Sequence, residues 1–277
     1  MIGEGRSVNE AVSVCGTIDK GRPSLARIRD YWLDGSQHVA ADRRLASQFV
    51  VCAPHLPYLV RTHRHFLRRV VSYLVAAGVR QFLDLGSGLP TAGNVHEIGQ
   101  SLAPDCRVVY VDNDPRVAAH ARRLLSGTPG VAFLCADLRD PGAVLGAVTG
   151  EGLLDPSRPV AVLMIDVLHL VPDADDPAGL IAAYTASACP GSYLALSHTA
   201  REDPGIRAGL ALFTRIYPDE LPRFNFRTPA EIAGLVAGLE LVPPGVVPVP
   251  LWRPEPDASA DRHPERFAGY AALGRTR

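Results

Sequence analysis

In FLDLGSGLPTAGNVHE, residues 82–97, an apolar run leads into two glycines, a proline and a helical pattern. Asp84 ends the strand-like run, and Gly86 and Gly88 form the turn that follows. Glycine is needed where the backbone takes a positive φ or approaches a ligand closely. A strand, a glycine turn and a helix in this order predict a site for a nucleotide-like ligand.

Apolar strand-like runs and amphipathic helical runs alternate along the chain from this turn onward. Strands are expected at residues 80–85, 107–111, 131–136, 160–167 and 193–197, with helices at 92–102, 116–125, 143–148 and 178–188. Strands that are continuously apolar are typical of a sheet covered by helices on both faces. The pattern predicts an α/β fold with a doubly wound parallel sheet.

The regions before and after this alternation differ from it. Helices are expected at residues 23–33, 40–49, 58–77, 206–217 and 229–239, and an antiparallel edge pair of strands at 246–252 and 267–273. We divide the chain into a disordered tail (1–17), an N-terminal helical cap or lid (18–78) and a Rossmann-like domain (79–277). Open α/β sheets bind ligands at the carboxyl ends of their strands, and the cap is expected there.

The charge balance and the absence of targeting signals narrow the class of protein. The 277 residues hold 28 Lys and Arg against 29 Asp and Glu, so we expect neither a nucleic-acid nor a membrane partner. The longest apolar run, residues 160–165, is too short to cross a bilayer, and no signal peptide is recognisable. The five cysteines are scattered and form no CxxC pair, which is typical of a protein in a reducing compartment. We therefore expect a cytoplasmic protein.

Acidic residues end three successive strands, at Asp84, Asp112 and Asp137. Asp112 can accept hydrogen bonds from both hydroxyls of a ribose. Asp137 can accept from an adenine amino group, while Leu138 offers a backbone N–H and an apolar face. A helix N-cap is the alternative for each aspartate, and for Asp137 it stays open. Together, the three carboxylates predict a nucleoside site.

Two positions distinguish the possible nucleoside cofactors. Thr91 stands at the third glycine position of the GxGxxG fingerprint, which disfavours an NAD-dependent oxidoreductase. The carboxylate of Asp84 would be unfavourable beside a pyrophosphate but favourable beside a cationic amino-acid group. S-adenosylmethionine combines an adenosine, a sulfonium and an amino-acid end, so it is the predicted cofactor, with S-adenosylhomocysteine as the product.

From about Asp19 to Arg275 the sequence resembles the actinobacterial S-adenosylmethionine-dependent methyltransferase family formerly listed as a domain of unknown function. RPSLARIRDYWLDGSQHVAADR (22–43), the glycine turn, VVYVDNDPRVAAHAR (108–122) and PGSYLALSH (190–198) carry the resemblance. It implies a class I methyltransferase fold, a Rossmann-like sheet of seven strands with helices on both faces. It also implies that Gly86, Ser87 and Gly88 wrap the methionine part, that Asp112 and Asn113 hold the ribose, and that Asp137 and Leu138 hold the adenine.

The resemblance further implies a lid over the cofactor, around Arg27, Tyr31, Gly35 and Arg64. The lid departs from the family pattern at Asp34, His38 and Val39, where members commonly show Gly-Gly and then Asn-Phe, and at His63, which replaces a usual Asn. Because of these departures, a second function stays open: the protein could bind S-adenosylmethionine without transferring its methyl group, as a regulator or scaffold.

Methyl transfer from a sulfonium depends chiefly on positioning, and a base helps if the acceptor is a hydroxyl or an amine. In MIDVLHLVPD, residues 164–173, His169 is a candidate base and Asp166 its orienter or a cofactor contact. His38, in the lid, is a second candidate base. Packing at a strand–helix junction for His169, and a surface contact for His38, remain equal alternatives.

The segment RTHRHFLRR, residues 61–69, is predicted to be helical, with Arg61, His65 and Arg68 on one face. Arg64 lies nearer the other face, as an inward arginine that binds a carboxylate. Histidines two apart on a helix point away from each other, so we expect no metal.

We therefore predict a methyltransferase that methylates an oxygen or a nitrogen of a small molecule in secondary metabolism. Assembly of the chain into a homo-oligomer stays an open alternative. The late aromatic residues Phe213, Tyr217, Phe224 and Phe226 are expected to shape the acceptor pocket or to belong to the core.

Overall fold

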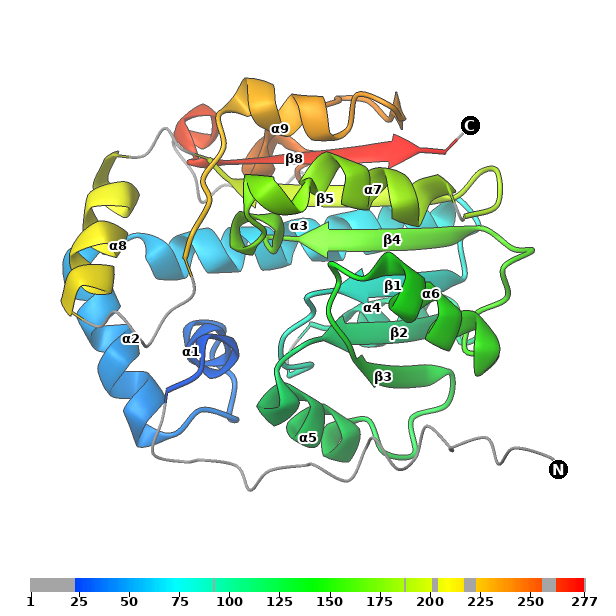
Figure 1. The fold of residues 1–277 in the computed structure, drawn as a ribbon, viewed down its shortest axis with the longest axis horizontal. Coiled ribbons are helices and arrows are strands. Elements are labelled where there is room, and N and C mark those ends of the chain that lie inside the picture. Colours follow the sequence, from blue (N-terminus) through cyan, green and yellow to red (C-terminus); the bar gives the residue numbers. More distant parts are fainter. Residues whose placement is uncertain are drawn as a thin grey trace, which may run out of the picture.

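A single sheet organises the computed structural model, which describes residues 23–91, 93–186, 188–200, 204–216, 223–255 and 263–276 (Figure 1). The strands are β1 (Gln81–Leu85), β2 (Arg107–Asp112), β3 (Val131–Cys135), β4 (Val160–Ile165), β5 (Tyr193–Thr199), β6 (Glu240–Leu241), β7 (Val247–Pro248) and β8 (Gly269–Arg275). Their order is β3-β2-β1-β4-β5-β8-β6, with β1 to β5 parallel and β8 antiparallel to β5. The expected tail, 1–17, lies outside the described residues.

The outer edge of β8 differs from the prediction. Since β5 occupies one edge of β8, both β6 and β7 pair with the other edge and share the seventh position of the sheet. The expected strand at 246–252 is wrong beyond Pro248, where Val249–Leu251 forms a 3₁₀ turn. Proline has no N–H for a strand ladder, and Pro248 and Pro250 end the pairing for that reason. The short strand β6 was not predicted.

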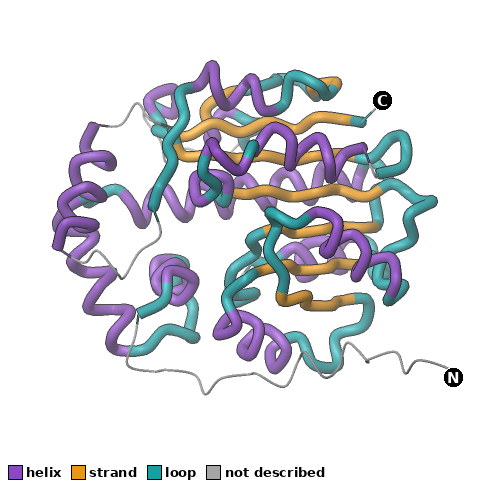
Figure 2. The backbone as a smooth tube through the Cα atoms, in the orientation of Figure 1, coloured by secondary structure: helices purple, strands orange, loops and turns teal. Residues whose placement is uncertain are grey.

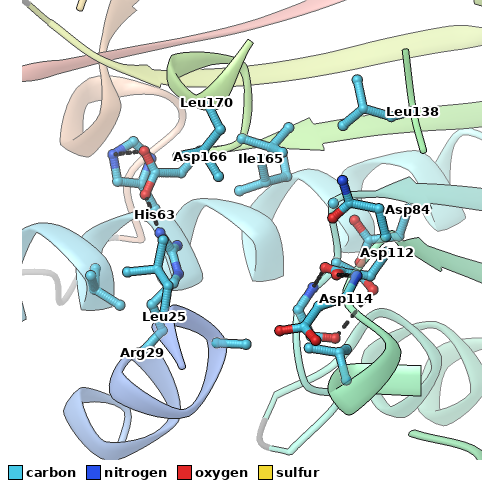
Figure 3. Close-up of a pocket in the computed structure, with 18 of the residues that line it drawn as sticks. Leu25, Arg29, His63, Asp84, Asp112, Asp114, Leu138, Ile165, Asp166 and Leu170 are labelled. Atoms are coloured by element: carbon cyan, nitrogen blue, oxygen red, sulfur yellow. Dashed lines mark hydrogen bonds and ion pairs between the residues drawn. The ribbon is translucent and has the colours of Figure 1, made fainter. Parts of the chain in front are cut away.

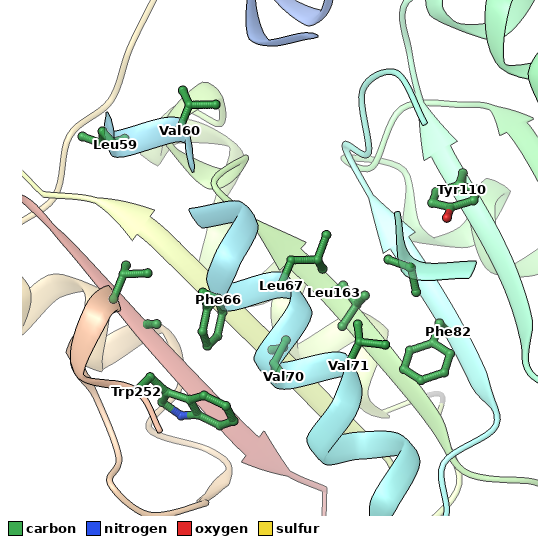
Figure 4. Packing of buried hydrophobic residues seen from close by; sticks show 14 of the residues in the cluster. Leu59, Val60, Phe66, Leu67, Val70, Val71, Phe82, Tyr110, Leu163 and Trp252 are labelled. Atoms are coloured by element: carbon green, nitrogen blue, oxygen red, sulfur yellow. The ribbon is translucent and has the colours of Figure 1, made fainter. Parts of the chain in front are cut away.

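Helices cover both faces of the sheet. On one face lie α3 (Leu56–Ala76), α4 (Val95–Leu102) and α5 (Pro115–Leu124), and on the other α6 (Pro141–Gly150), α7 (Pro177–Ala186) and α9 (Pro229–Leu235) (Figure 2). Phe82 and Leu163 lie beside Val71 and Leu67 of α3, as Figure 4 shows. Neighbouring strand residues such as Leu83 belong to the cluster on the opposite face. Burial on both faces explains why the strands are continuously apolar, and it confirms the predicted α/β fold.

The remaining helices, α1 (Leu25–Trp32), α2 (Ala40–Cys52) and α8 (Pro204–Ile216), lie beyond the carboxyl ends of the parallel strands (Figure 1). A buried ion pair joins α1 to α2, because Asp42 Oδ2 accepts from Arg27 Nε at 2.7 Å. The same carboxylate also accepts from the backbone N–H groups of Ser24 and Val39. The two short helices are therefore held as one unit over the end of the sheet where ligands bind.

No helix in the part of the chain that the structure describes has both the length and the hydropathy that a bilayer span requires.

Candidate functional site

A cavity of about 470 Å³ opens at the carboxyl ends of β1, β2 and β4, with α1 and α3 as its opposite wall (Figure 3). It brings together most of the predicted site residues: Arg64, Asp84, Gly86, Ser87, Gly88, Asp112, Asn113, Asp137, Leu138 and Asp166. Asp84, Asp112 and Asp114 lie on one side in Figure 3, and Arg29, His63 and Asp166 lie on the other. The cavity thus has an acidic side and a side where charges are paired.

The turn after β1 requires glycine at its first position. Gly86 has a φ of 68° and Gly88 a φ of 63°, both in the left-handed region. The Gly86 and Ser87 amides donate to the Val111 carbonyl at 2.8 and 3.1 Å, which fixes the turn to the end of β2. A Cβ on Gly86 would overlap the side chain of Val167, which follows β4. The turn therefore passes close to the neighbouring strand end and leaves its backbone open to the cavity.

Asp84 is a buried carboxyl on the acidic side, with only 7% of its surface exposed. Burial raises its pKa to about 7, although the nearby Arg64 guanidinium acts in the opposite direction. Arg64 turns inward while Arg61, His65 and Arg68 are exposed, as the helical spacing predicts. A carboxyl that titrates near neutrality gains stability from any cation placed beside it.

Asp112 is held by the backbone and keeps capacity for a ligand. Its Oδ2 accepts from the Gly88 N–H and its Oδ1 from the Asp114 N–H, both at 2.9 Å. Each carboxylate oxygen has a second lone pair, so two further donors can be accepted. The N-cap of α5 is Asp114, whose carboxylate accepts from the Arg116 N–H. Capping therefore does not explain Asp112.

Asp137 has a partner that the sequence did not reveal. Arg139 Nη2 donates to Asp137 Oδ2 at 2.6 Å, and Arg139 Nη1 donates to Asp175 at 3.0 Å. Hydrogen bonds from Arg139 lower the pKa of Asp137 and keep it ionised. The N-cap of α6 is Asp140, which removes the capping alternative for Asp137. The Leu138 carbonyl accepts from the Tyr184 hydroxyl at 2.8 Å, which fixes this loop against α7.

Asp166 directly follows β4 and is the centre of the paired side. Its Oδ2 accepts from Arg29 Nη1 at 2.7 Å, and its Oδ1 accepts from Thr199 Oγ1 at 2.9 Å. Burial alone would raise the pKa of Asp166, but the charged Arg29 guanidinium favours the ionised carboxylate, and the pKa lies well below its usual range. The residue has a φ of 51°, so the surrounding bonds keep it in a conformation unusual for aspartate.

His63 lines the cavity, although the sequence identified it only as a departure from the family pattern. Its Nδ1 lies 2.8 Å from Ser197 Oγ, and its Nε2 lies 3.6 Å from Asp166 Oδ1. Burial lowers its pKa to about 4, so the imidazole is neutral near pH 7. Its position on the apolar stripe of α3, with Leu59, Phe66 and Val70, is the signal that could have placed it inward.

His169 is buried but lines a second, smaller pocket beside the cavity. Its Nδ1 lies 3.3 Å from Asp166 Oδ1, and its ring stacks on Phe224 with centroids 5.4 Å apart. Asp166 lines both spaces, whereas His169 lines only the second pocket, so Asp166 separates His169 from the cavity. Phe224 and Phe226 also line this second pocket. Tyr217 lies outside the described residues, as does the Phe213 side chain.

Three predicted site residues, Tyr31, Gly35 and His38, line neither space. The Tyr31 ring packs edge-on against His38, and Arg43 Nη1 lies 3.2 Å from His38 Nδ1. Gly35 is needed for a local reason, because a Cβ there would overlap the Asp30 carboxylate. These three residues therefore do not border either space in the structure, and their role toward the cofactor or the acceptor stays a prediction.

Among the residues that the structure describes, no group of three or more His, Cys, Asp or Glu side chains is arranged to hold a metal ion.

Known proteins match the chain along nearly its whole length. The family model for S-adenosyl methyltransferases matches residues 13–277. A DUF574 family protein from Streptomyces avermitilis MA-4680 is 38% identical, with a TM-score of 0.85 over 94% of this chain and 100% of that one. A proposed methyltransferase from Thermobifida fusca YX is 36% identical, with a TM-score of 0.82 over 99% and 100% of the two chains. No curated protein matches the chain.

The family match confirms the resemblance found in the sequence and sets aside an NAD-dependent oxidoreductase. The geometry of the site agrees with this family. The glycine turn and the buried Asp84 carboxyl suit the amino-acid end of the cofactor. Asp112, which can still accept hydrogen bonds, suits the nucleoside end. The chain belongs to the S-adenosyl methyltransferase family and is an S-adenosylmethionine-dependent methyltransferase.

Proposed function

We propose that the enzyme methylates a hydroxyl or amine of a small molecule in secondary metabolism, with the cofactor extended along the 470 Å³ cavity. The amino-acid end would lie beside Asp84 and the Gly86–Gly88 turn, the ribose beside Asp112 and Asn113, and the adenine beside Asp137 and Leu138. The observation that carries this placement is the buried Asp84 carboxyl, which a cationic group would stabilise in its ionised form.

The bound cofactor supplies an electrophilic methyl group on a sulfonium. Asp166, at the end of β4, would lie on the reacting side, and its bonds to Arg29 and Thr199 hold that wall rigid. Positioning of this kind can supply much of the rate enhancement. His63, with a pKa of about 4, is a weak base near pH 7, so His169 is the better candidate to take a proton from the acceptor.

Calorimetric titration with S-adenosylmethionine tests the placement of the cofactor. Asp84→Asn keeps the shape of the side chain and removes its charge, so we expect the dissociation constant to rise about tenfold or more, the equivalent of about 1.4 kcal/mol. Asp105→Asn, on an exposed aspartate of the same type, is the matched control. Equal affinities for the Asp84→Asn variant and the natural protein would contradict the placement.

Binding should also depend on pH in a defined direction. Burial raises the pKa of Asp84 to about 7 in the free protein, and a neighbouring ammonium would lower that pKa. Cofactor binding should therefore release a proton, and affinity should rise as pH rises from 5.5 to 7, by up to about tenfold per unit. Titrations in two buffers with different ionisation heats measure the proton directly. The Asp84→Asn variant should lose this dependence, and a pH-independent affinity in the natural protein would refute the linkage.

The role of His169 is tested by its effect on turnover. General-base catalysis contributes about 10²-fold to 10⁴-fold, so His169→Ala should lower turnover by at least about a hundredfold. The dissociation constant for S-adenosylhomocysteine should change little, because His169 does not line the cavity. Release of S-adenosylhomocysteine with an acceptor found by screening alcohols, phenols and amines gives the rate, and exposed His65→Ala is the control. An unchanged turnover would remove His169 from the mechanism.

A further inference from the structure

The second pocket adjoins the cavity at the Arg29–Asp166 ion pair. Both spaces are lined by Leu25, Arg29, Val60 and Asp166. The second has a volume of about 50 Å³, roughly a tenth of the first. A water needs about 10–15 Å³ of such space, so the pocket admits a group of only a few heavy atoms. A larger molecule would place its remaining atoms beside Asp166, at the junction of the two spaces, which is the region lined by the four shared residues.

The walls of this pocket are mostly apolar and come from segments far apart in sequence. Its apolar lining consists of Leu25, Trp32, Phe49, Leu56, Leu59, Val60, Ile206, Leu210, Phe224 and Phe226. Its polar residues are Arg29, Asp166, His169 and Thr199, joined around Asp166 by an ion pair, a hydroxyl hydrogen bond and a close imidazole. An occupant therefore needs one apolar end and one polar atom facing Asp166.

Aromatic rings form one side of the pocket in a near-parallel array. His169 and Phe224 have centroids 5.4 Å apart with planes inclined by 9°, and Phe224 and Phe226 have centroids 6.0 Å apart with the same inclination. The Trp32 indole also lines the pocket, and its buried Nε1 has no hydrogen-bond partner among the described residues. Such walls favour a planar ring, since each aromatic pair adds about 0.5–1.5 kcal/mol beyond burial.

The charges at the junction balance each other. Arg29 and Asp166 pair at 2.7 Å, and His63, whose pKa is about 4, is neutral near pH 7. Farther along, Arg227 pairs with Asp173 at 2.7 Å, so its charge is also matched. A carboxylate or an alkylammonium entering this space would lose its hydration without gaining a counter-ion, which costs several kcal/mol or more. Alkylamines are protonated near pH 7, whereas phenols, with a pKa of about 10, are neutral.

We propose that this second pocket is the acceptor subsite and that the acceptor is a small neutral phenol, so that the enzyme is an O-methyltransferase. The inference rests on the function proposed above and narrows it. The apolar edge of the ring enters the pocket, and the hydroxyl faces Asp166 and His169 from the side of the cavity. In the reaction an O–C bond forms as the S–C bond breaks, the sulfur keeps the electron pair, and the hydroxyl proton passes to the His169 ring.

The test uses the full chain saturated with S-adenosylhomocysteine and the probe 4-methylphenol, with benzoate and benzylamine as charged comparisons. Calorimetry should show saturable binding of 4-methylphenol and at least tenfold weaker binding of both charged probes. Leu210→Trp fills the pocket and should weaken 4-methylphenol binding at least tenfold, with S-adenosylhomocysteine affinity unchanged. Leu212→Trp, on the same helix but 39% exposed, is the matched control.

A second measurement does not depend on a substitution. The chain has two tryptophans, Trp32 in the pocket and Trp252 buried against Phe66. In ¹⁵N-labelled protein, 4-methylphenol should shift the Trp32 indole resonance and leave that of Trp252 in place. No shift, equal binding of benzylamine, or undiminished binding to Leu210→Trp would overturn the acceptor assignment. Failure of S-adenosylhomocysteine to bind would instead overturn the placement of the cofactor, so the two failures are distinguishable.

Discussion

Replacing Gly86 with alanine should abolish measurable S-adenosylhomocysteine binding and lower the melting temperature. A φ of 68° costs a residue with a Cβ about 1–2 kcal/mol. The new Cβ would also overlap the Val167 side chain, and such overpacking costs about 1–3 kcal/mol. A loss of about 2–5 kcal/mol corresponds to roughly 3–9 °C in a domain of this size. Calorimetric titration and thermal unfolding measure the two effects.

Two further variants separate backbone strain from the clash. Gly78 has a φ of 91°, but a Cβ added there would meet no atom within 4 Å beyond its chain neighbours. Gly78→Ala should therefore show the strain alone and keep full cofactor affinity. Adding Val167→Ala to Gly86→Ala removes the overlapping methyl groups and should recover part of the affinity. A Gly86→Ala variant that binds as tightly as the natural protein would show that the turn does not need to pass so close to Val167.

Asp42→Ala should lower the free energy of unfolding about as much as Gly86→Ala does, for an electrostatic reason. The substitution leaves the Arg27 guanidinium, 2% exposed, without its carboxylate. It also removes the acceptor for the Ser24 and Val39 N–H groups. Breaking a buried ion pair from one side costs about 3–5 kcal/mol, and urea unfolding measures it.

The control for Asp42 is the exposed ion pair between Arg80 and Asp105, whose aspartate side chain is 66% exposed. Asp105→Ala should cost less than about 1 kcal/mol, because water already solvates both charges. Equal losses for the two variants would mean that the bonds of Asp42 do not stabilise the pair of helices over the cavity.

The sequence predicts the sheet and most of one wall of the cavity, because both depend on local pattern. Continuous apolar runs identify the strands, and the strand ends place Asp84 and Asp112 at one edge. His63 was missed because its role arises from a contact between elements, whereas Arg139 pairs with Asp137 only two residues away and also with the distant Asp175. His63 lies beside Asp166 from a position 103 residues earlier in the chain (166 − 63), and no local pattern indicates this pairing.

The lid residues depend on a family pattern and not on local sequence. Tyr31, Gly35 and His38 were assigned to the site because of where they lie in a family pattern. The backbone after α1 turns tightly, with the Gly35 N–H donating to the Asp30 carbonyl at 2.9 Å, and none of the three residues borders the cavity. The orientation of a short helical connection depends on its caps and on tertiary packing, which spacing alone does not determine.

The interrupted edge of β8 bears on the solubility of the enzyme. Two strands of two residues each, β6 and β7, cover that edge, and the segment that joins them contains Pro243 and Pro244. With Pro248 inside β7, this border offers no continuous row of amide donors to a strand from another molecule. Short pairings and prolines of this kind oppose intermolecular β-sheet growth, so this side of the sheet is protected against aggregation.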